Sequence, residues 1–204
     1  MMLKTLQFEV DRMKGVSSKG LDNYLKESLT AGGGKWMAMP VRVYIGPGDG
    51  VEGYKPEFVE ILKAAFKEWS DATAGKLQFA FVENSADSGI NCRWTANPKD
   101  LVNPLEGGQA LAAQDLQGKI VRVEMLILTK SPQIPGGLTD KFVRHVCLHE
   151  IGHALGLAGH SSQPGDIMFS AASIDAATGV MSARDKKTIS LLYENAASVL
   201  QLKQ

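Results

Sequence analysis

The sequence predicts a single domain of the α+β class (a mixed α/β fold) built around one twisted, mixed β-sheet. The predicted elements run strand, helix, several strands, helix, loop and helix, which is typical of one sheet covered by helices. The chain has 204 residues, enough for one domain with a buried core. Its 44% apolar and 22% charged residues are ordinary for a globular protein.

The first half of the main domain alternates between strand-like and helix-like segments. Residues 40–46 alternate with period two and contain β-branched side chains, which predicts a strand. Residues 56–73 repeat apolar side chains at helical spacing, so we expect a helix whose apolar stripe lies against the sheet. Two short strands are expected at 77–83 and 89–95.

The centre of the chain carries two further strands and a long helix. A weak strand at 109–114 and a strong one at 119–129 follow a loop rich in Pro, Gly, Asn and Asp. Thr139 is a suitable N-cap for a helix over 140–156. This helix is apolar almost all round, so we expect it to be buried.

The last predicted helix follows a long loop over 157–181. Ser182 and Asp185 have the spacing of a capping-box pair, which opens helices. We expect the helix to begin there and to continue to about residue 200.

Residues 1–35 are expected to form an N-terminal extension, without an assigned role, packed on a main domain that spans 36–204. Residues 6–10 alternate like a strand, and residues 21–29 follow helical spacing. The first 15 residues lack the unbroken apolar stretch of a signal peptide.

Charge and cysteine content exclude several classes of protein. Lys plus Arg and Asp plus Glu both total 22, and a net charge of zero argues against nucleic-acid binding. No run of about 18 apolar residues is present, so we expect no membrane span. Cys92 and Cys147 are expected to be buried free thiols, although one bridge between them is an alternative. We expect a monomer.

A candidate metal site lies in the segment HEIGHALGLAGH, which begins at residue 149. His149 and His153 are four residues apart on the predicted helix, so both rings project from one face. Neutral imidazole is a preferred zinc ligand. Glu150 is rotated by about 100° from His149 and can approach the metal without binding it, as a general base does.

Further candidates follow the two histidines. Gly156 can take a positive φ angle and end the helix, which lets the chain turn back. His160 is then available as a third ligand, and Met168 follows eight residues later. His145, four residues before His149, could share its helical face, but a structural role is the other interpretation.

These residues resemble the metzincin zinc peptidases, whose motif is His-Glu-x-x-His-x-x-Gly-x-x-His followed by a Met-turn. The Ser after the third His and the distance to DIM resemble the matrixins most. Weaker similarity covers about residues 36–195. The resemblance implies a metzincin-like single domain in which 36–204 is the catalytic domain, with an active-site helix, a Met-turn and a C-terminal helix.

The spacing departs from the family motif at one point. The third His is expected six residues after the second, but that position is Gly159 and the imidazole is at His160. We assign His160 as the ligand, because glycine has no ligating side chain and loops tolerate insertions. A different zinc family with a carboxylate as third ligand is the alternative, and its candidates are Asp166, Asp175 and Glu194.

The resemblance implies a zinc-dependent endopeptidase that hydrolyses peptide bonds through a zinc-activated water, with Glu150 as general base. His149, His153 and His160 would bind one catalytic Zn²⁺, with Met168 as an apolar floor. A structural Ca²⁺ is also compatible with it.

The resemblance also implies a peptide or protein substrate and an extracellular location. The substrate would add to an edge strand at Ala110, Leu111 and Ala112. A zinc-binding module with lost or restricted proteolytic activity is the alternative function.

Overall fold

The computed structural model describes residues 22–131, 134, 136–170 and 179–194. Its elements are α2 (Leu25–Thr30), β1 (Val41–Ile45), α3 (Glu57–Ala72), β2 (Phe79–Val82), η1 (Ser85–Asp87), β3 (Ile90–Thr95), η2 (Pro98–Asp100), β4 (Gly108–Gln114), β5 (Ile120–Leu128), α4 (Asp140–Ala154) and α5 (Ala183–Glu194). The predicted α+β class is confirmed. The expected strand over 6–10 and the last helix beyond residue 194 lie outside the described residues.

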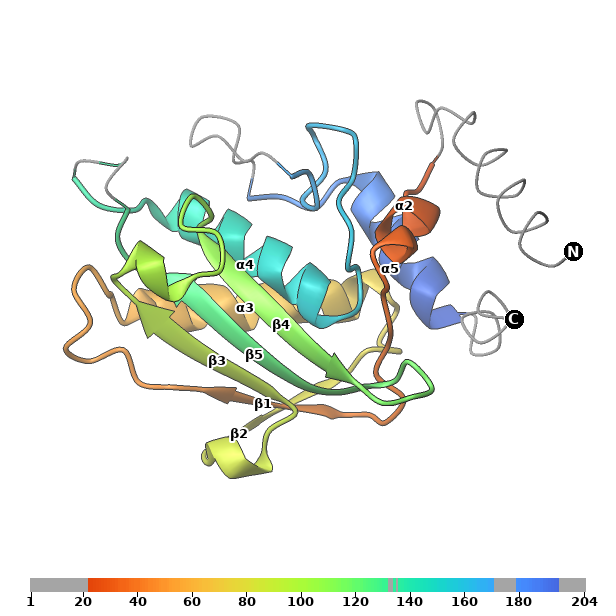
Figure 1. Ribbon diagram of the computed structural model, residues 1–204, viewed down its shortest axis with the longest axis horizontal. Helices are drawn as coiled ribbons and strands as arrows, with labels where there is room; N and C mark the ends of the chain where they lie inside the picture. Colours follow the sequence, from red (N-terminus) through yellow and green to blue (C-terminus); the bar gives the residue numbers. More distant parts are fainter. Residues whose placement is uncertain (1–21, 132–133, 135, 171–178, 195–204) are drawn as a thin grey trace, which may run out of the picture.

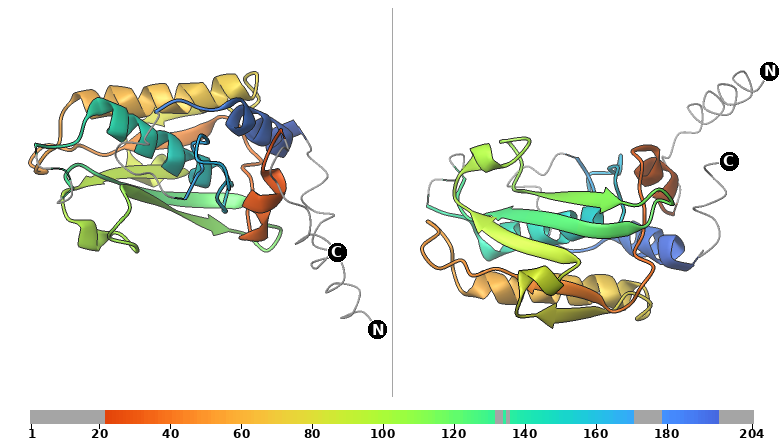
Figure 2. Two further views of the ribbon diagram at one scale, coloured as in Figure 1. Left: turned by 90° about the horizontal axis from the view of Figure 1, so that it is seen from above. Right: turned by 60° about the horizontal axis from the view of Figure 1, so that its bottom comes forward.

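The five strands form one mixed sheet in the order β2-β1-β3-β5-β4. β2, β1, β3 and β5 are parallel to one another, whereas β4 pairs with β5 antiparallel and forms one edge. Figures 1 and 2 show α3 and α4 side by side on one face of this sheet. α4 runs behind β4 and β5, which brings the predicted active-site helix to the antiparallel edge.

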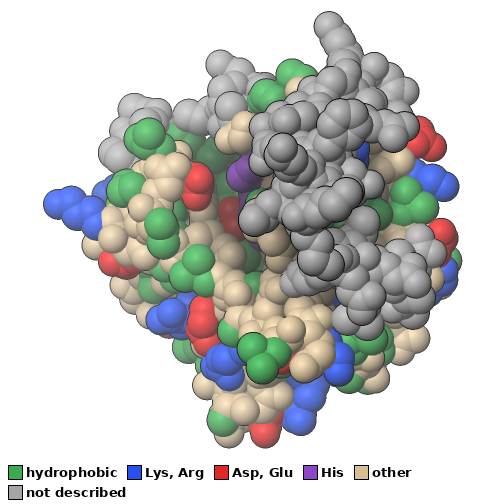
Figure 3. Space-filling view, turned by 45° about the vertical axis from the view of Figure 1, so that its right-hand side comes forward, with side chains coloured by type: hydrophobic (Ala, Val, Ile, Leu, Met, Phe, Trp, Pro, Cys, Tyr) green, Lys and Arg blue, Asp and Glu red, His purple; other side chains and the backbone are tan. Residues whose placement is uncertain are grey.

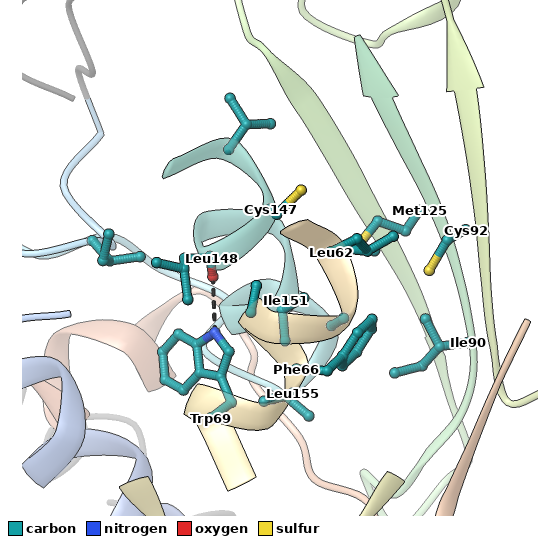
Figure 4. Close-up of a cluster of buried hydrophobic side chains, with 14 of the residues drawn as sticks. Leu62, Phe66, Trp69, Ile90, Cys92, Met125, Cys147, Leu148, Ile151 and Leu155 are labelled. Carbon is teal, nitrogen blue, oxygen red and sulfur yellow. Dashed lines mark hydrogen bonds between the residues drawn. The ribbon is translucent and has the colours of Figure 1, made fainter. Parts of the chain in front are cut away.

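The core lies between the two long helices and the sheet. The apolar stripe of α3 is fully buried, as its spacing predicts, and consists of Phe58, Leu62, Ala65, Phe66 and Trp69. Trp69 Nε1 donates to the Leu148 carbonyl oxygen of α4 at 3.0 Å (Figure 4). Cys92 and Cys147 are buried free thiols in this core.

α4 is buried along most of its length, because β4, β5 and α3 all pack against it. Thr139 caps its N-terminus by accepting a hydrogen bond from the Phe142 amide at 3.2 Å. Gly156 ends it with a φ of 106°, a conformation that glycine adopts without strain. The chain then turns back across the end of α4.

α5 begins with the predicted capping box. Ser182 N donates to Asp185 Oδ2 at 2.7 Å, and Asp185 N donates to Ser182 Oγ at 3.0 Å. In Figure 1, α2 lies beside α5. Within the described ranges, no helix combines the length and the apolar content that a membrane crossing requires.

Candidate metal centre and active site

Three histidine side chains converge beside the antiparallel edge of the sheet. His149 and His153 project from one face of α4, and His160 reaches the same point from the loop that follows the helix. One ligating atom from each ring lies within 4.8 Å of the others. The two Nε2 atoms of His149 and His153 are 3.1 Å apart. Figure 3 shows histidine side chains in a hollow beside a carboxylate.

Backbone carbonyls orient the two helical rings. His149 Nδ1 lies 2.7 Å from the Ile167 carbonyl oxygen, and His153 Nδ1 lies 2.7 Å from that of Leu157. An Nδ1–H that donates to a carbonyl leaves the lone pair on Nε2, facing the cluster. This is the arrangement that metal-ligating histidines adopt.

The charge state of the cluster also fits a zinc ion. Burial, helped by the neighbouring His153, lowers the pKa of His149 to about 3. Burial likewise lowers the pKa of His153 to about 4, and it lowers the pKa of His160. The rings are therefore neutral at pH 7, as a zinc ligand requires. Within the described residues, no other group of three or more His, Cys, Asp or Glu side chains meets in this way.

Glu150 lies next to the histidines and is almost fully buried. Its Oε2 atom has no hydrogen-bond partner in the described structure. Burial, and to a smaller extent the negative charge of Glu106, raises the pKa of Glu150 to about 8. A cation held by the histidines would lower this pKa again, because an opposite charge favours the carboxylate.

This burial predicts a pH-dependent stability of the metal-free chain. The folded pKa of Glu150 lies above its unfolded value of 4.5, so the folded chain retains a proton that the unfolded chain releases. The contribution is present below pH 4.5 and is lost as the pH rises to about 8. Between about pH 6.5 and 7.5, the free energy of unfolding should fall by roughly 1 kcal/mol per pH unit, and the slope should weaken as the pH approaches 8.

Denaturant unfolding with a chelator present, at several pH values, measures this slope for wild type and Glu150→Gln. The substitution should remove most of the decline. Parallel pH profiles for the two proteins would contradict the burial of an ionisable Glu150.

Two glycines bring β4 close to Glu150. A methyl group at Gly108 would lie 2.9 Å from Glu150 Cγ, and one at Gly107 would lie 2.5 Å from Val146 Cγ2. Sequence reasoning did not assign these glycines to the site. The Gly-Gly pair before a strand was the available signal, because glycine at a strand end often permits a close backbone approach.

Met168 is fully buried and packs against α4 at Gly152, between His149 and His153. A side chain at Gly152 would overlap the Met168 sulfur. Met168 therefore lies against the helix that carries His149 and His153, while its role as a floor for the metal stays a prediction.

The alternative carboxylate ligands have other partners or positions. Asp166 is buried and accepts hydrogen bonds from Ser161, Ser182 and Arg184. Glu194 is exposed on α5, where it accepts a hydrogen bond from Ser190. Asp175 lies outside the described residues.

Two cavities open at the histidine cluster. The first, of about 430 Å³, follows β4 from Gln109 to Ala112. The second, of about 340 Å³, lies between α4 and the segment that ends at Ser170, and Phe142, His145 and Val146 line it. His145 is buried, and neither of its ring nitrogens has a hydrogen-bond partner in the described structure.

Comparison with known proteins identifies the family. The family model of the matrixins, the M10 peptidases, matches residues 52–194. The chain belongs to the matrixin family. Membership places this matrixin among the zinc metallopeptidases at family level. A comparison with curated proteins finds none that matches.

Among solved structures, the matrixin is similar to myroilysin, with 17% sequence identity and a TM-score of 0.49. The similarity covers 78% of this chain and 95% of myroilysin. The family assignment therefore rests on the match to residues 52–194.

Proposed function

We propose that this matrixin is a zinc endopeptidase in which His149, His153 and His160 hold the metal and Glu150 is the general base. The observation that carries the proposal is the convergence of three neutral imidazoles beside a buried carboxylate without a partner. A purely structural zinc site closes its coordination shell with protein ligands. Three imidazoles leave a position open, and a structural site has no need of Glu150.

In the proposed hydrolysis, the metal and Glu150 have separate roles. Bound zinc would act as a Lewis acid that acidifies water and polarises the substrate carbonyl. The Glu150 carboxylate accepts the proton of the attacking water and delivers it to the leaving amide nitrogen. Glu150 is buried, and the backbone of Gly108 lies close to its side chain, so the carboxylate has a surrounding of low polarity that strengthens its electrostatic interactions.

The free edge of β4 provides a binding site for an extended peptide. Leu128 N donates to the Gly107 carbonyl oxygen at 2.9 Å, which fixes the alternation of the β4–β5 pair. By this alternation the backbone N–H and C=O groups of Leu111 point toward β5, whereas those of Ala110 and Ala112 point toward the cavity. We propose that a substrate pairs with these two alanines as an additional strand.

The second cavity would receive a substrate side chain next to the cleaved bond. It opens at His149 and Glu150 and extends toward Phe142 and Val146 of α4. The extracellular location implied by the family would give this site access to secreted or surface proteins.

Loss and return of activity with the metal tests the proposed function. The zinc-loaded chain should cleave an unfolded protein, a chelator should abolish cleavage, and added Zn²⁺ should restore it. Gel electrophoresis of the substrate measures all three states. If the chain binds one zinc ion and cuts none of a broad set of unfolded proteins, the binding-module alternative is correct.

Substitution of Ala112 by Pro tests the edge strand. Proline removes the N–H that faces the cavity and leaves the hydrogen bonds to β5 intact, so folding should be retained. We expect KM for a peptide to rise by about 2- to 10-fold, the cost of one hydrogen bond, with a smaller effect on kcat. The matched variant Ala113→Pro removes an N–H that faces β5 and should chiefly lower the melting temperature. Equal KM values for Ala112→Pro and wild type would exclude this binding mode.

A further inference from the structure

Residues 24–34 lie outside the segment that matches the matrixin model, yet they pack directly against the loop that carries His160. They contact the end of β4 and the turn after it, the loop over 156–162 that carries His160, and the first turns of α5. We call residues 156–162 the ligand loop. The contacts reach the third and the first candidate ligands by separate routes.

The first route flanks His160 on both sides. Gly159 N donates to the Ser28 carbonyl oxygen at 2.8 Å, and Ser162 N donates to Glu27 Oε2 at 3.3 Å. A methyl group at Gly159 would lie 2.7 Å from the Glu27 carbonyl oxygen. The backbone of α2 therefore touches the residue immediately before the third ligand.

Glycines in residues 24–34 and in the ligand loop allow the two backbones to approach each other closely. A side chain at Gly156 would overlap the backbone of Gly34, and a methyl group at Gly33 would lie 2.5 Å from the Gly156 carbonyl oxygen. The two segments are thus in backbone contact at the point where α4 ends and the ligand loop begins.

The second route runs through α5 to His149. The Tyr24 hydroxyl donates to Asp185 Oδ1 at 2.5 Å, and the Ile167 amide donates to Asp185 Oδ2 at 2.9 Å. The Ile167 carbonyl oxygen is the group that His149 Nδ1 contacts at 2.7 Å. Tyr24 is 1% exposed, so this hydrogen-bonded chain is shielded from water.

We propose that residues 24–34 form a clamp that positions the zinc ligands of this matrixin, above all His160. The inference rests on the proposed function, in which the three histidines hold zinc. A loop of sequence GLAGH is intrinsically flexible, and ordering it on metal binding costs conformational entropy. The clamp orders the loop in advance, which raises the affinity for the metal.

The clamp also accounts for the unusual spacing of the third histidine. Gly159 stands where the motif has its third histidine, and Gly159 is the residue that docks on Ser28. The longer loop is therefore held by a contact with Ser28, which lies outside the segment that matches the family model. On this proposal residues 24–34 belong to the catalytic domain, and the expected boundary between residues 35 and 36 moves toward the N-terminus.

Three glycine-to-alanine variants of the full chain test the clamp. Gly33→Ala adds a methyl group to the clamp that would push the ligand loop away. Gly159→Ala adds one to the ligand loop that would push the clamp away. Gly165→Ala is the matched control, because a methyl group there meets no atom within 4 Å. Zinc affinity is measured by competition with a chelator, and the visible spectrum of the Co²⁺-loaded chain reports the geometry at the metal.

We expect Gly33→Ala and Gly159→Ala to weaken zinc binding by about 10- to 100-fold, the usual effect of losing support around a ligand. Their Co²⁺ spectra should change, whereas Gly165→Ala should match wild type. Lower melting temperatures with unchanged zinc affinity and Co²⁺ spectra would overturn the clamp. If wild-type chain itself binds no zinc, the proposed function fails instead.

Tyr24→Phe provides a variant that keeps the packing of the ring. It removes only the hydroxyl that donates to Asp185, so the chain should fold. We expect weaker zinc binding and a changed Co²⁺ spectrum, with a smaller effect than Gly159→Ala. A Co²⁺ spectrum identical to that of wild type would exclude the route through Asp185.

Discussion

Replacement of Glu150 by Gln should lower kcat by about 10²- to 10⁴-fold, the usual contribution of a general acid–base group. Gln has nearly the same shape as Glu but cannot accept the proton of the attacking water. Zinc binding should be retained, because Glu150 is not among the three converging ligands. Steady-state hydrolysis of a fluorogenic peptide, with the zinc content measured on the same samples, checks this result.

The matched control is Glu57→Gln on the exposed surface of α3, where the same chemical change should leave kcat unaltered. A Glu150→Gln protein with full zinc content and wild-type kcat would show that another group takes the proton. Loss of zinc together with activity would point instead to a role of Glu150 in shaping the centre.

The parts of the centre that could be predicted from sequence are those set by local geometry. His149, Glu150 and His153 lie on one helix, so a spacing of four residues determines which side chains share a face. The helix itself follows from its cap at Thr139 and its apolar content. Gly156 was predictable for the same reason, because only the residues just before it decide how α4 ends.

The parts that could not be predicted depend on contacts between distant segments. The approach of Gly108 to Glu150 requires the antiparallel pairing of β4 with β5, which no local pattern specifies. The hydrogen bond from the Tyr24 hydroxyl to Asp185 joins residues that are 161 positions apart in the sequence. The capping spacing predicts the bond from Ser182 N to Asp185 Oδ2, but the same oxygen also accepts from the Ile167 amide, and only the tertiary structure places Ile167 there.

Replacement of His160 by Ala removes a direct ligand and should weaken zinc binding by more than about 100-fold. Loss of a residue that only supports a ligand costs about 10- to 100-fold in affinity. His160 is the most exposed of the three histidines and lies on a loop, so the change should have little effect on the core. Chelator competition measures the affinity. His145→Ala is the matched control, since it removes the fourth histidine of the chain and should leave the zinc affinity near that of wild type.

A double variant, Gly159→His with His160→Gly, separates the identity of the ligand from its spacing. It places an imidazole six residues after His153, the spacing of the matrixin motif. Gly159 has no room for a side chain, since even a methyl group would lie 2.7 Å from the Glu27 carbonyl oxygen. We therefore expect the double variant to bind zinc no better than His160→Ala. Wild-type affinity in the double variant would mean that the ligand loop adjusts freely to either spacing and that α2 does not restrain it.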